Sequence, residues 1–118
     1  MNKFEKNAGL DMYEDSNREK ERKVLKYFKE FFEIEDIDVV LRVHDSRVNH
    51  YSVYMEITKE VKEKIMQEYS CKVNKNIIGR IDNIETIGKV SFTIYNCKGK
   101  KKKELIEKHN EEFENKKY

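Results

Sequence analysis

One stretch of the chain, Ile37 to Thr58, alternates apolar and polar residues in two arms, and this pattern constrains the fold more than any other feature. A period of two residues is typical of a strand that buries one face and leaves the other polar. The segment between the arms, Asp45 to His50, is made mostly of turn-type residues, which favours an antiparallel hairpin. The apolar positions of the two arms are Val39, Leu41, Val43, Val53, Met55 and Ile57.

A helix is expected before this hairpin. Ser16 is a good N-cap, and Glu19 three residues later can complete a capping box with it. An apolar stripe with helical spacing then follows along one side of the segment. The stripe is Val24, Leu25, Phe28, Phe31 and Phe32. Three phenylalanines can bury a large area, so we expect this stripe to cover the aliphatic face of the hairpin.

The rest of the chain repeats the scheme of helix and hairpin. Thr58 is a plausible N-cap for a second helix that ends near Tyr69, and 70–76 is expected to be a connector. A second hairpin follows, with an outgoing arm at 77–82 and a clearer return arm from Val90 to Tyr95. The predicted fold class is α+β, an antiparallel sheet of two hairpins packed on an amphipathic helix, in the order α-β-β-α-β-β-α.

At 118 residues the chain is expected to form one domain, since two halves would each be too small to stabilise themselves. Residues 1–15 are predicted to be a partly ordered N-terminal arm that docks through Phe4, Leu10, Met12 and Tyr13. Residues 16–99 form the predicted α+β core domain. Residues 100–118 form a basic and then acidic helical tail.

Composition limits the functional classes more than it selects one. Charged residues make up 41% of the chain but nearly cancel, to a net charge of +2, so total charge does not indicate nucleic acid. The two cysteines lack metal-ligand spacing, and the sequence has neither a signal peptide nor a membrane-spanning run. These features favour a cytoplasmic protein without a cofactor. The enrichment in Lys, Glu, Asn and Ile is typical of AT-rich coding, as in a low-GC bacterium, its phages or its plasmids.

The polar face of the predicted sheet is the first candidate binding surface. If the strand phases are right, Arg42, His44, Tyr54 and Tyr95 point away from the first helix. Aromatic side chains beside cations on an open sheet can stack bases and hold phosphates. The alternative is that the second or third helix covers this face, or that these residues form cross-strand pairs on a solvated sheet.

A run of lysines is the second candidate. Five lysines in six residues produce a local positive field that can hold phosphates without reading sequence. The alternative is that the acidic residues of the following helix, from Glu104 to Glu114, pair with the run. The five are Lys98, Lys100, Lys101, Lys102 and Lys103.

The first hairpin loop offers a third candidate. Two histidines and a carboxylate, His44, His50 and Asp45, could hold a divalent metal if the strand ends bring them together. The alternative is that these residue types occur there because they suit a turn.

No catalytic motif is present, neither a GxSxG nucleophile elbow nor a glycine-rich phosphate loop. We therefore predict a small non-enzymatic binding module that acts through protein–protein contact, as an inhibitor, adaptor or accessory factor, plausibly of a nucleic-acid-handling complex. The first alternative is direct nucleic-acid binding through the sheet face and the 98–103 lysine run. The second is a metal-dependent enzyme that uses the 44–50 loop.

Overall fold

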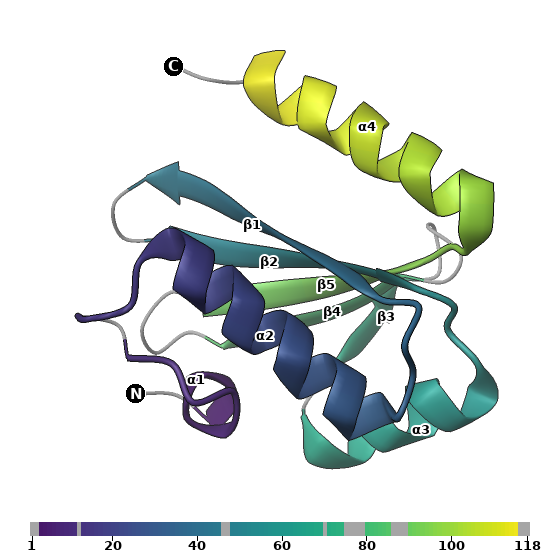
Figure 1. Cartoon of the computed structure of the whole chain (residues 1–118). Helices are drawn as coiled ribbons and strands as arrows, with labels where there is room; N and C mark the ends of the chain where they lie inside the picture. The colour runs from purple at the N-terminus through teal and green to yellow at the C-terminus, as the bar shows by residue number, and fades with distance from the viewer. Residues whose placement is uncertain are drawn as a thin grey trace.

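A computed structural model describes residues 3–11, 13–45, 48–69, 71–74, 80–85 and 90–115. Within these ranges, the side chains of 44–45, 48, 72–74, 80–85 and 115 are not described. The described part contains four helices and five strands (Figure 1). In chain order they are α1 (Lys3–Asn7), α2 (Asn17–Phe32), β1 (Asp38–Asp45), β2 (Val48–Met55), α3 (Lys59–Glu68), β3 (Lys72–Asn74), β4 (Arg80–Glu85), β5 (Val90–Asn96) and α4 (Gly99–Asn115).

The five strands form one mixed sheet in the order β1-β2-β5-β4-β3. β1 pairs antiparallel with β2, and β4 pairs antiparallel with both β3 and β5. β2 and β5 run parallel at the centre, with Tyr51 opposite Phe92 and Val53 opposite Ile94. The fold is α+β as predicted, but the expectation of a purely antiparallel sheet was wrong. α3, β3 and β4 lie between β2 and β5 in the chain. This long connection lets β5 run parallel to β2.

Two further details differ from the prediction. The first hairpin has a shorter connection than expected, because β1 extends to Asp45 and β2 already begins at Val48. The segment predicted to be a connector, 70–76, contributes the short strand β3, which pairs with β4 at the edge opposite β1. The predicted outgoing arm at 77–82 is described only from Arg80 onward.

α2 begins and packs as its sequence predicts. The hydroxyl of Ser16 accepts a hydrogen bond from the Glu19 amide, as predicted for an N-cap. Among the described residues the Glu19 carboxylate bonds Arg22, so it does not return to the Ser16 amide as the predicted capping box requires. Val24, Phe28 and Phe32 are buried against the sheet, and Leu25 and Phe31 flank them in part. The sheet contributes a matching apolar face. Its buried residues are Val39, Tyr51, Val53, Met55, Val90, Phe92 and Ile94.

The N-terminal segment belongs to this core. Phe4 on α1 is 1% exposed and packs against aromatic rings from three other elements, among them Phe28 and Phe92. Leu10 is also buried, whereas Tyr13 is 97% exposed and does not dock as we expected. Met12 lies outside the described residues. α3 closes the same side of the core through Val61 and Ile65, after Thr58 caps its start.

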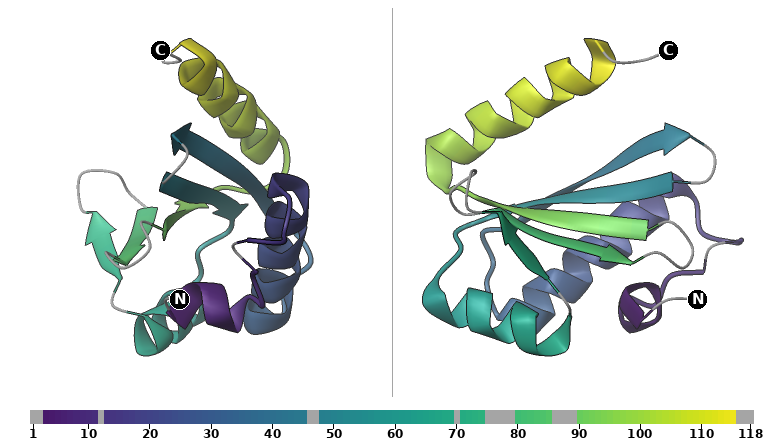
Figure 2. Two further views of the ribbon diagram at one scale, coloured as in Figure 1. Left: turned by 90° about the vertical axis from the view of Figure 1, so that its left-hand side faces the viewer. Right: turned by 180° about the vertical axis from the view of Figure 1, so that it is seen from behind.

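α4 lies on the opposite face of the sheet from α1, α2 and α3, as the three views of Figures 1 and 2 agree. The sheet is therefore the middle layer of three, with helices on both sides. None of the buried residues of the hydrophobic core belongs to α4 in the described part of the chain. No helix in the described ranges is long and apolar enough to cross a membrane.

Candidate functional site

The polar face of the sheet, our first candidate surface, lies beneath α4. Arg42 on β1 and Tyr54 on β2 are 7% and 0% exposed, and Tyr95 on β5 is partly buried beside them. From sequence, this face could bind a ligand, be covered by a helix or remain solvated. The structure shows that α4 covers it. A ligand would reach Arg42 or Tyr54 only after α4 had moved. His44, the fourth residue of this set, has a side chain outside the description.

Hydrogen bonds hold α4 on this face. The Arg42 guanidinium donates to the Tyr54 hydroxyl at 2.9 Å and also to the Asn110 side-chain oxygen. The Tyr54 hydroxyl lies 2.8 Å from Nδ1 of His109, and the Tyr54 ring stacks on Tyr95 with centroids 5.3 Å apart. Burial raises the pKa of Tyr54, so its hydroxyl stays protonated near neutral pH.

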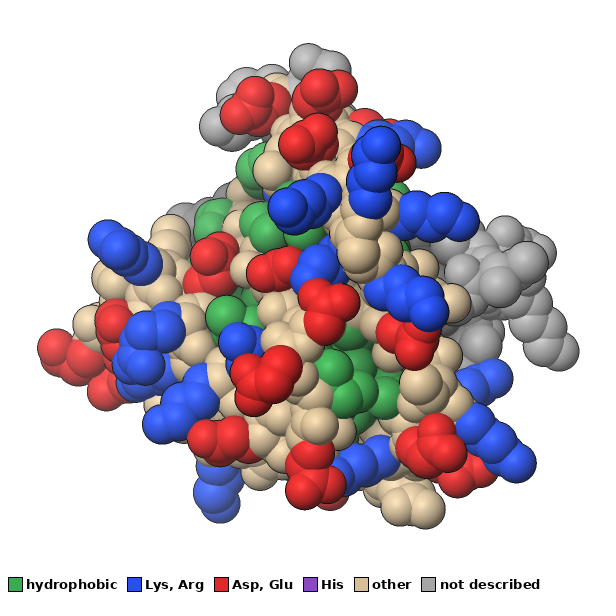
Figure 3. Space-filling view, turned by 45° about the vertical axis from the view of Figure 1, so that its right-hand side comes forward, with side chains coloured by type: hydrophobic (Ala, Val, Ile, Leu, Met, Phe, Trp, Pro, Cys, Tyr) green, Lys and Arg blue, Asp and Glu red, His purple; other side chains and the backbone are tan. Residues whose placement is uncertain are grey.

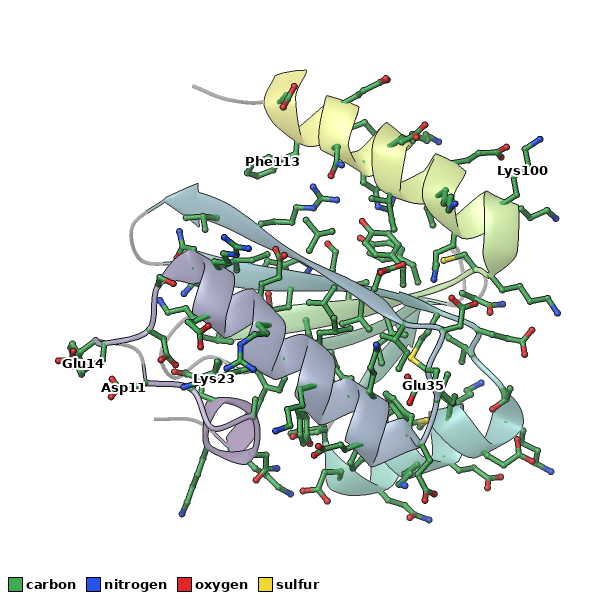
Figure 4. All side chains as sticks on the ribbon, viewed as in Figure 1. Asp11, Glu14, Lys23, Glu35, Lys100 and Phe113 are labelled. Atoms are coloured by element: carbon green, nitrogen blue, oxygen red, sulfur yellow. The ribbon has the colours of Figure 1, made fainter. Side chains whose placement is uncertain are left out.

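The end of α4 adds an aromatic contact to this network. The Phe113 ring centroid lies 5.9 Å from the Arg42 guanidinium carbon, and Figure 4 shows the Phe113 side chain pointing from α4 toward β1. Cation–π contacts at this distance are weakly attractive. The side chains that the sequence offered as ligand contacts, Arg42, Tyr54 and Tyr95, therefore interact with one another and with α4. This arrangement is typical of a satisfied structural network.

The five lysines of the run differ in burial and in ion pairing. Lys102 is buried and bonds to both Asp36 and Asp38, which attaches the start of α4 to the start of β1. Burial alone would lower the pKa of Lys102, but its hydrogen bonds to the two carboxylates raise it, so the ammonium stays charged. Lys98 pairs with Glu56 at 2.8 Å and remains largely exposed.

The other three lysines of the run, Lys100, Lys101 and Lys103, are exposed on the first turns of α4. Figure 4 shows Lys100 pointing away from the body of the protein. In the described part of the chain, none of these three forms an ion pair. The acidic residues later in α4 therefore do not neutralise the run by direct pairing, and three cations remain open to a ligand.

The third candidate cannot be assembled from the described residues, because the side chains of His44 and Asp45 lie outside them. His50 is described, and its Nδ1 lies 2.5 Å from the hydroxyl of Ser91 on β5. The described residues contain no cluster of three or more His, Cys, Asp or Glu side chains that could hold a metal. The metal hypothesis therefore stays a prediction about the loop itself.

A hollow of about 330 Å³ lies between α1 and α2 and is lined largely by polar side chains, including Asn7, Arg22, Lys26 and Tyr27. At its rim the hydroxyls of Tyr27 and Tyr69 lie 2.6 Å apart, and Asn7 donates to Tyr69 at 3.0 Å. Burial raises the pKa of both phenols, so they remain neutral near pH 7. These bonds join α1, α2 and the end of α3.

Sequence reasoning missed the open edge of the sheet at β1. β1 is eight residues long and has β2 on one side only. The amide of Leu41 donates to the Glu21 carboxylate of α2 at 2.9 Å, so this amide points away from β2. Alternation in an antiparallel pair then directs the amides of Val39 and Val43 outward as well. The period-two pattern indicated a strand here, but it carried no signal that the strand would be at an edge.

Comparison with protein-family models found no match, and searches of curated proteins and of solved structures found no significant similarity either. Function must therefore be argued from the geometry of the chain itself.

Proposed function

We propose that the chain is a small non-enzymatic binding module that acts through protein–protein contact, as an inhibitor, adaptor or accessory factor. The observation that supports this proposal is the open edge of β1. An edge strand presents a row of backbone amides and carbonyls to which an extended segment of another chain can pair. Recognition by strand addition takes its affinity mainly from these main-chain hydrogen bonds, so it needs no catalytic groups and no deep pocket.

The surroundings of β1 suit such contact. α2 lies on one side of the sheet and α4 on the other, so an added strand would meet side chains of both helices. Leu41 and Val43 are only partly buried and leave apolar surface beside the edge. Figure 3 shows acidic and basic side chains interspersed over the face it presents, with hydrophobic patches between them. The apolar patches can enter the core of an interface, and the charges around them suit its polar rim.

The polar network between α4 and the sheet supports the same proposal. The Tyr54 hydroxyl already contacts Arg42 and His109, and Arg42 also contacts Asn110. A catalytic acid or base must reach a substrate, whereas Tyr54 is fully buried beneath α4. A role for these residues in docking α4 accounts for their contacts without a reaction.

Peptide selection with an edge-blocked variant tests the proposal. Heptapeptides selected on the wild-type chain are expected to lose affinity at least tenfold on Leu41→Pro, which removes the outward amide hydrogen but no bond to β2. Val61→Ala on α3 serves as a control of reduced stability far from the edge. Circular dichroism checks that both variants fold. Selected peptides that bind Leu41→Pro and the wild type equally would refute strand addition at β1.

A second candidate function is direct nucleic-acid binding, and the exposure of Lys100, Lys101 and Lys103 favours it. These three lysines and Lys98 project from one end of α4. Lys100 and Lys103 also line a hollow with Gly99 and with the paired side chains of Lys102 and Asp36. Cations placed together in this way can contact successive phosphates without base recognition.

A salt series distinguishes this candidate. If three lysines contact single-stranded DNA or RNA, the plot of log affinity against log salt should have a slope of about −2. Lys100→Glu with Lys101→Glu should abolish that binding, while the charge-matched control Lys59→Glu with Lys62→Glu, at two exposed positions on α3, should change it little. Absence of binding at low salt would refute the candidate.

A further inference from the structure

We infer that the segment received by β1 carries a lysine or arginine opposite Leu41, so that its cation pairs with Glu21. The inference rests on the proposed strand addition and specifies the chemistry of the partner. It also disfavours a second copy of the chain as the occupant. Three observations carry it: the position of Glu21, the charges around the start of β1, and the geometry that self-pairing would produce.

Glu21 occupies the place of a missing strand. Its carboxylate oxygen lies 2.9 Å from the Leu41 amide, where a carbonyl oxygen of an added strand would accept the same hydrogen. The Glu21 side chain is partly buried on the inner side of α2. When a partner carbonyl takes over the Leu41 amide, the carboxylate loses its donor but stays at the edge. A buried or half-buried charge without a partner is unfavourable, so the incoming segment must supply a donor or a cation.

The start of the edge is acidic as well. The side chains of Glu35, Asp36 and Asp38 are 97%, 58% and 51% exposed. Lys102 pairs with both aspartates, so its single charge cannot neutralise the two of them together. The nearby cation of β1, Arg42, lies on the other face beneath α4 and bonds to Tyr54. Glu35 also pairs with Lys29 of α2 at 3.9 Å, so the carboxylates of Asp36 and Asp38 are the ones that favour a cation at this end of an added strand.

Strand addition also determines where the basic side chain must stand. Residues directly opposite each other across two strands project on the same face of the sheet. Leu41 projects toward α2, because it packs against the core on that side. The residue opposite Leu41 therefore projects toward α2 too, next to Glu21. A long cationic side chain at this position reaches the carboxylate, while its neighbours in sequence project toward α4.

A second copy of the chain fits this edge poorly. Antiparallel pairing of two β1 strands about a two-fold axis at Leu41 places Leu41 opposite Leu41 of the other copy. Each copy brings Glu21 to that same point, so two carboxylates approach each other across the axis. Like charges directly across a strand pair are destabilising. Glu21 therefore disfavours self-association while it attracts a basic partner.

Titration of the isotope-labelled full chain with three capped heptapeptides tests the inference. Their sequences are Thr-Val-Thr-X-Thr-Val-Thr, with Lys, Gln or Glu at X, and nuclear magnetic resonance follows the amides of Val39, Leu41 and Val43. The Lys peptide should bind about fivefold more tightly than the Glu peptide, as for a partly exposed ion pair. Glu21→Gln keeps an oxygen acceptor for the Leu41 amide and should bring the three affinities together. Glu63→Gln on α3, an exposed position, is the matched control and should preserve the difference.

The outcomes separate the inference from the proposed function. If no peptide shifts the β1 amides, strand addition itself fails. If all three peptides shift them with equal affinity, the proposed function stands and the inference about charge is overturned. Sedimentation velocity measures whether the Glu21→Gln variant forms a dimer. A variant that dimerises through β1 but shows the wild-type preference for the Lys peptide would mean that Glu21 only prevents self-pairing, which also overturns the inference.

Discussion

Two tyrosines on β2 should respond in opposite directions to loss of the hydroxyl group. Tyr51 and Tyr54 are both fully buried, but they lie on opposite faces of the sheet. The Tyr51 side chain belongs to the hydrophobic core, and its buried hydroxyl has no hydrogen-bond partner in the described part of the chain. The Tyr54 hydroxyl lies 2.9 Å from the Arg42 guanidinium and 2.8 Å from His109. Tyr51→Phe should therefore stabilise the fold, and Tyr54→Phe should destabilise it.

The magnitudes follow from these contacts. A buried polar group without a partner costs about 1–3 kcal/mol, and Tyr51→Phe removes that cost but leaves a small void, so we expect a gain of about 1 kcal/mol. Tyr54→Phe removes one bond to a charged group and one to a histidine and deprives both groups of a partner, so we expect a loss of about 2 kcal/mol. The two variants delete the same atom from the same strand, and each therefore controls for the other.

Urea unfolding followed by far-ultraviolet circular dichroism measures both changes; the chain has no tryptophan to report by fluorescence. With a slope of about 1.5 kcal/mol per molar urea, the midpoint should rise by roughly 0.7 M for Tyr51→Phe and fall by roughly 1.3 M for Tyr54→Phe. The measurement belongs at pH 7, because burial raises the pKa of both phenols and keeps them neutral there. A destabilised Tyr51→Phe, or a neutral Tyr54→Phe, would refute this description of the two faces.

Three further predictions concern α1, the docking of α4 and Cys97 in the connection between β5 and α4. Phe4→Ala should cost about 3 kcal/mol in urea unfolding, whereas Tyr13→Ala, at a fully exposed position, should change stability by less than about 0.5 kcal/mol. The hydrogen bond from Lys102 lowers the pKa of Asp36, so its contribution to α4 docking is fully present above the unfolded pKa and is lost as pH falls through the folded pKa. Because the intrinsic rate of amide exchange itself changes with pH, the readout is the protection factor, which should fall in α4 below about pH 4 in the wild type but change less in Asp36→Asn. Burial raises the pKa of the Cys97 thiol to about 11, so iodoacetamide at pH 8 should modify Cys97 much more slowly in the folded chain than in the urea-unfolded chain. Peptide mass mapping separates Cys97 from the other free thiol, Cys71, and equal rates at Cys97 would contradict its burial.

Local patterns predicted the elements whose signal is contained in their own residues. The alternation around Val53 and Val90 identified strands, and the spacing of Phe28 and Phe32 identified the face of α2 that packs on the sheet. Both signals arise because a side chain's direction repeats with a fixed period in each structure. Ser16 and Thr58 were found as caps for a similar reason, since the bond they accept comes from three residues along the chain.

Pairing between distant strands left no such signal. Tyr51 lies opposite Phe92 across the parallel β2–β5 pair, but neither residue's neighbours specify a partner some forty positions away. β3 and α1 have three and five residues, too few for a period to emerge. The docking of α4 depends on polar residues such as His109 and Asn110, and their types alone do not separate a covered face from a solvated one.

The open edge of β1, which the proposed function uses, likewise left no signal in the sequence. A long exposed edge invites aggregation, and proteins commonly blunt it with proline, bulges or inward charges. This chain contains no proline, and β1 continues regularly as far as Val43 before its pairing shifts. Its central amide is instead capped by a carboxylate from α2, a contact that can open without disturbing the ladder to β2. In the proposed strand addition, this cap protects the edge in the absence of a partner and yields to a strand that brings its own carbonyl and a cation, whereas a permanent block such as proline would exclude every partner. Because opening the Glu21–Leu41 contact breaks no bond of the β1–β2 ladder, we propose this edge as the first surface at which to look for a partner.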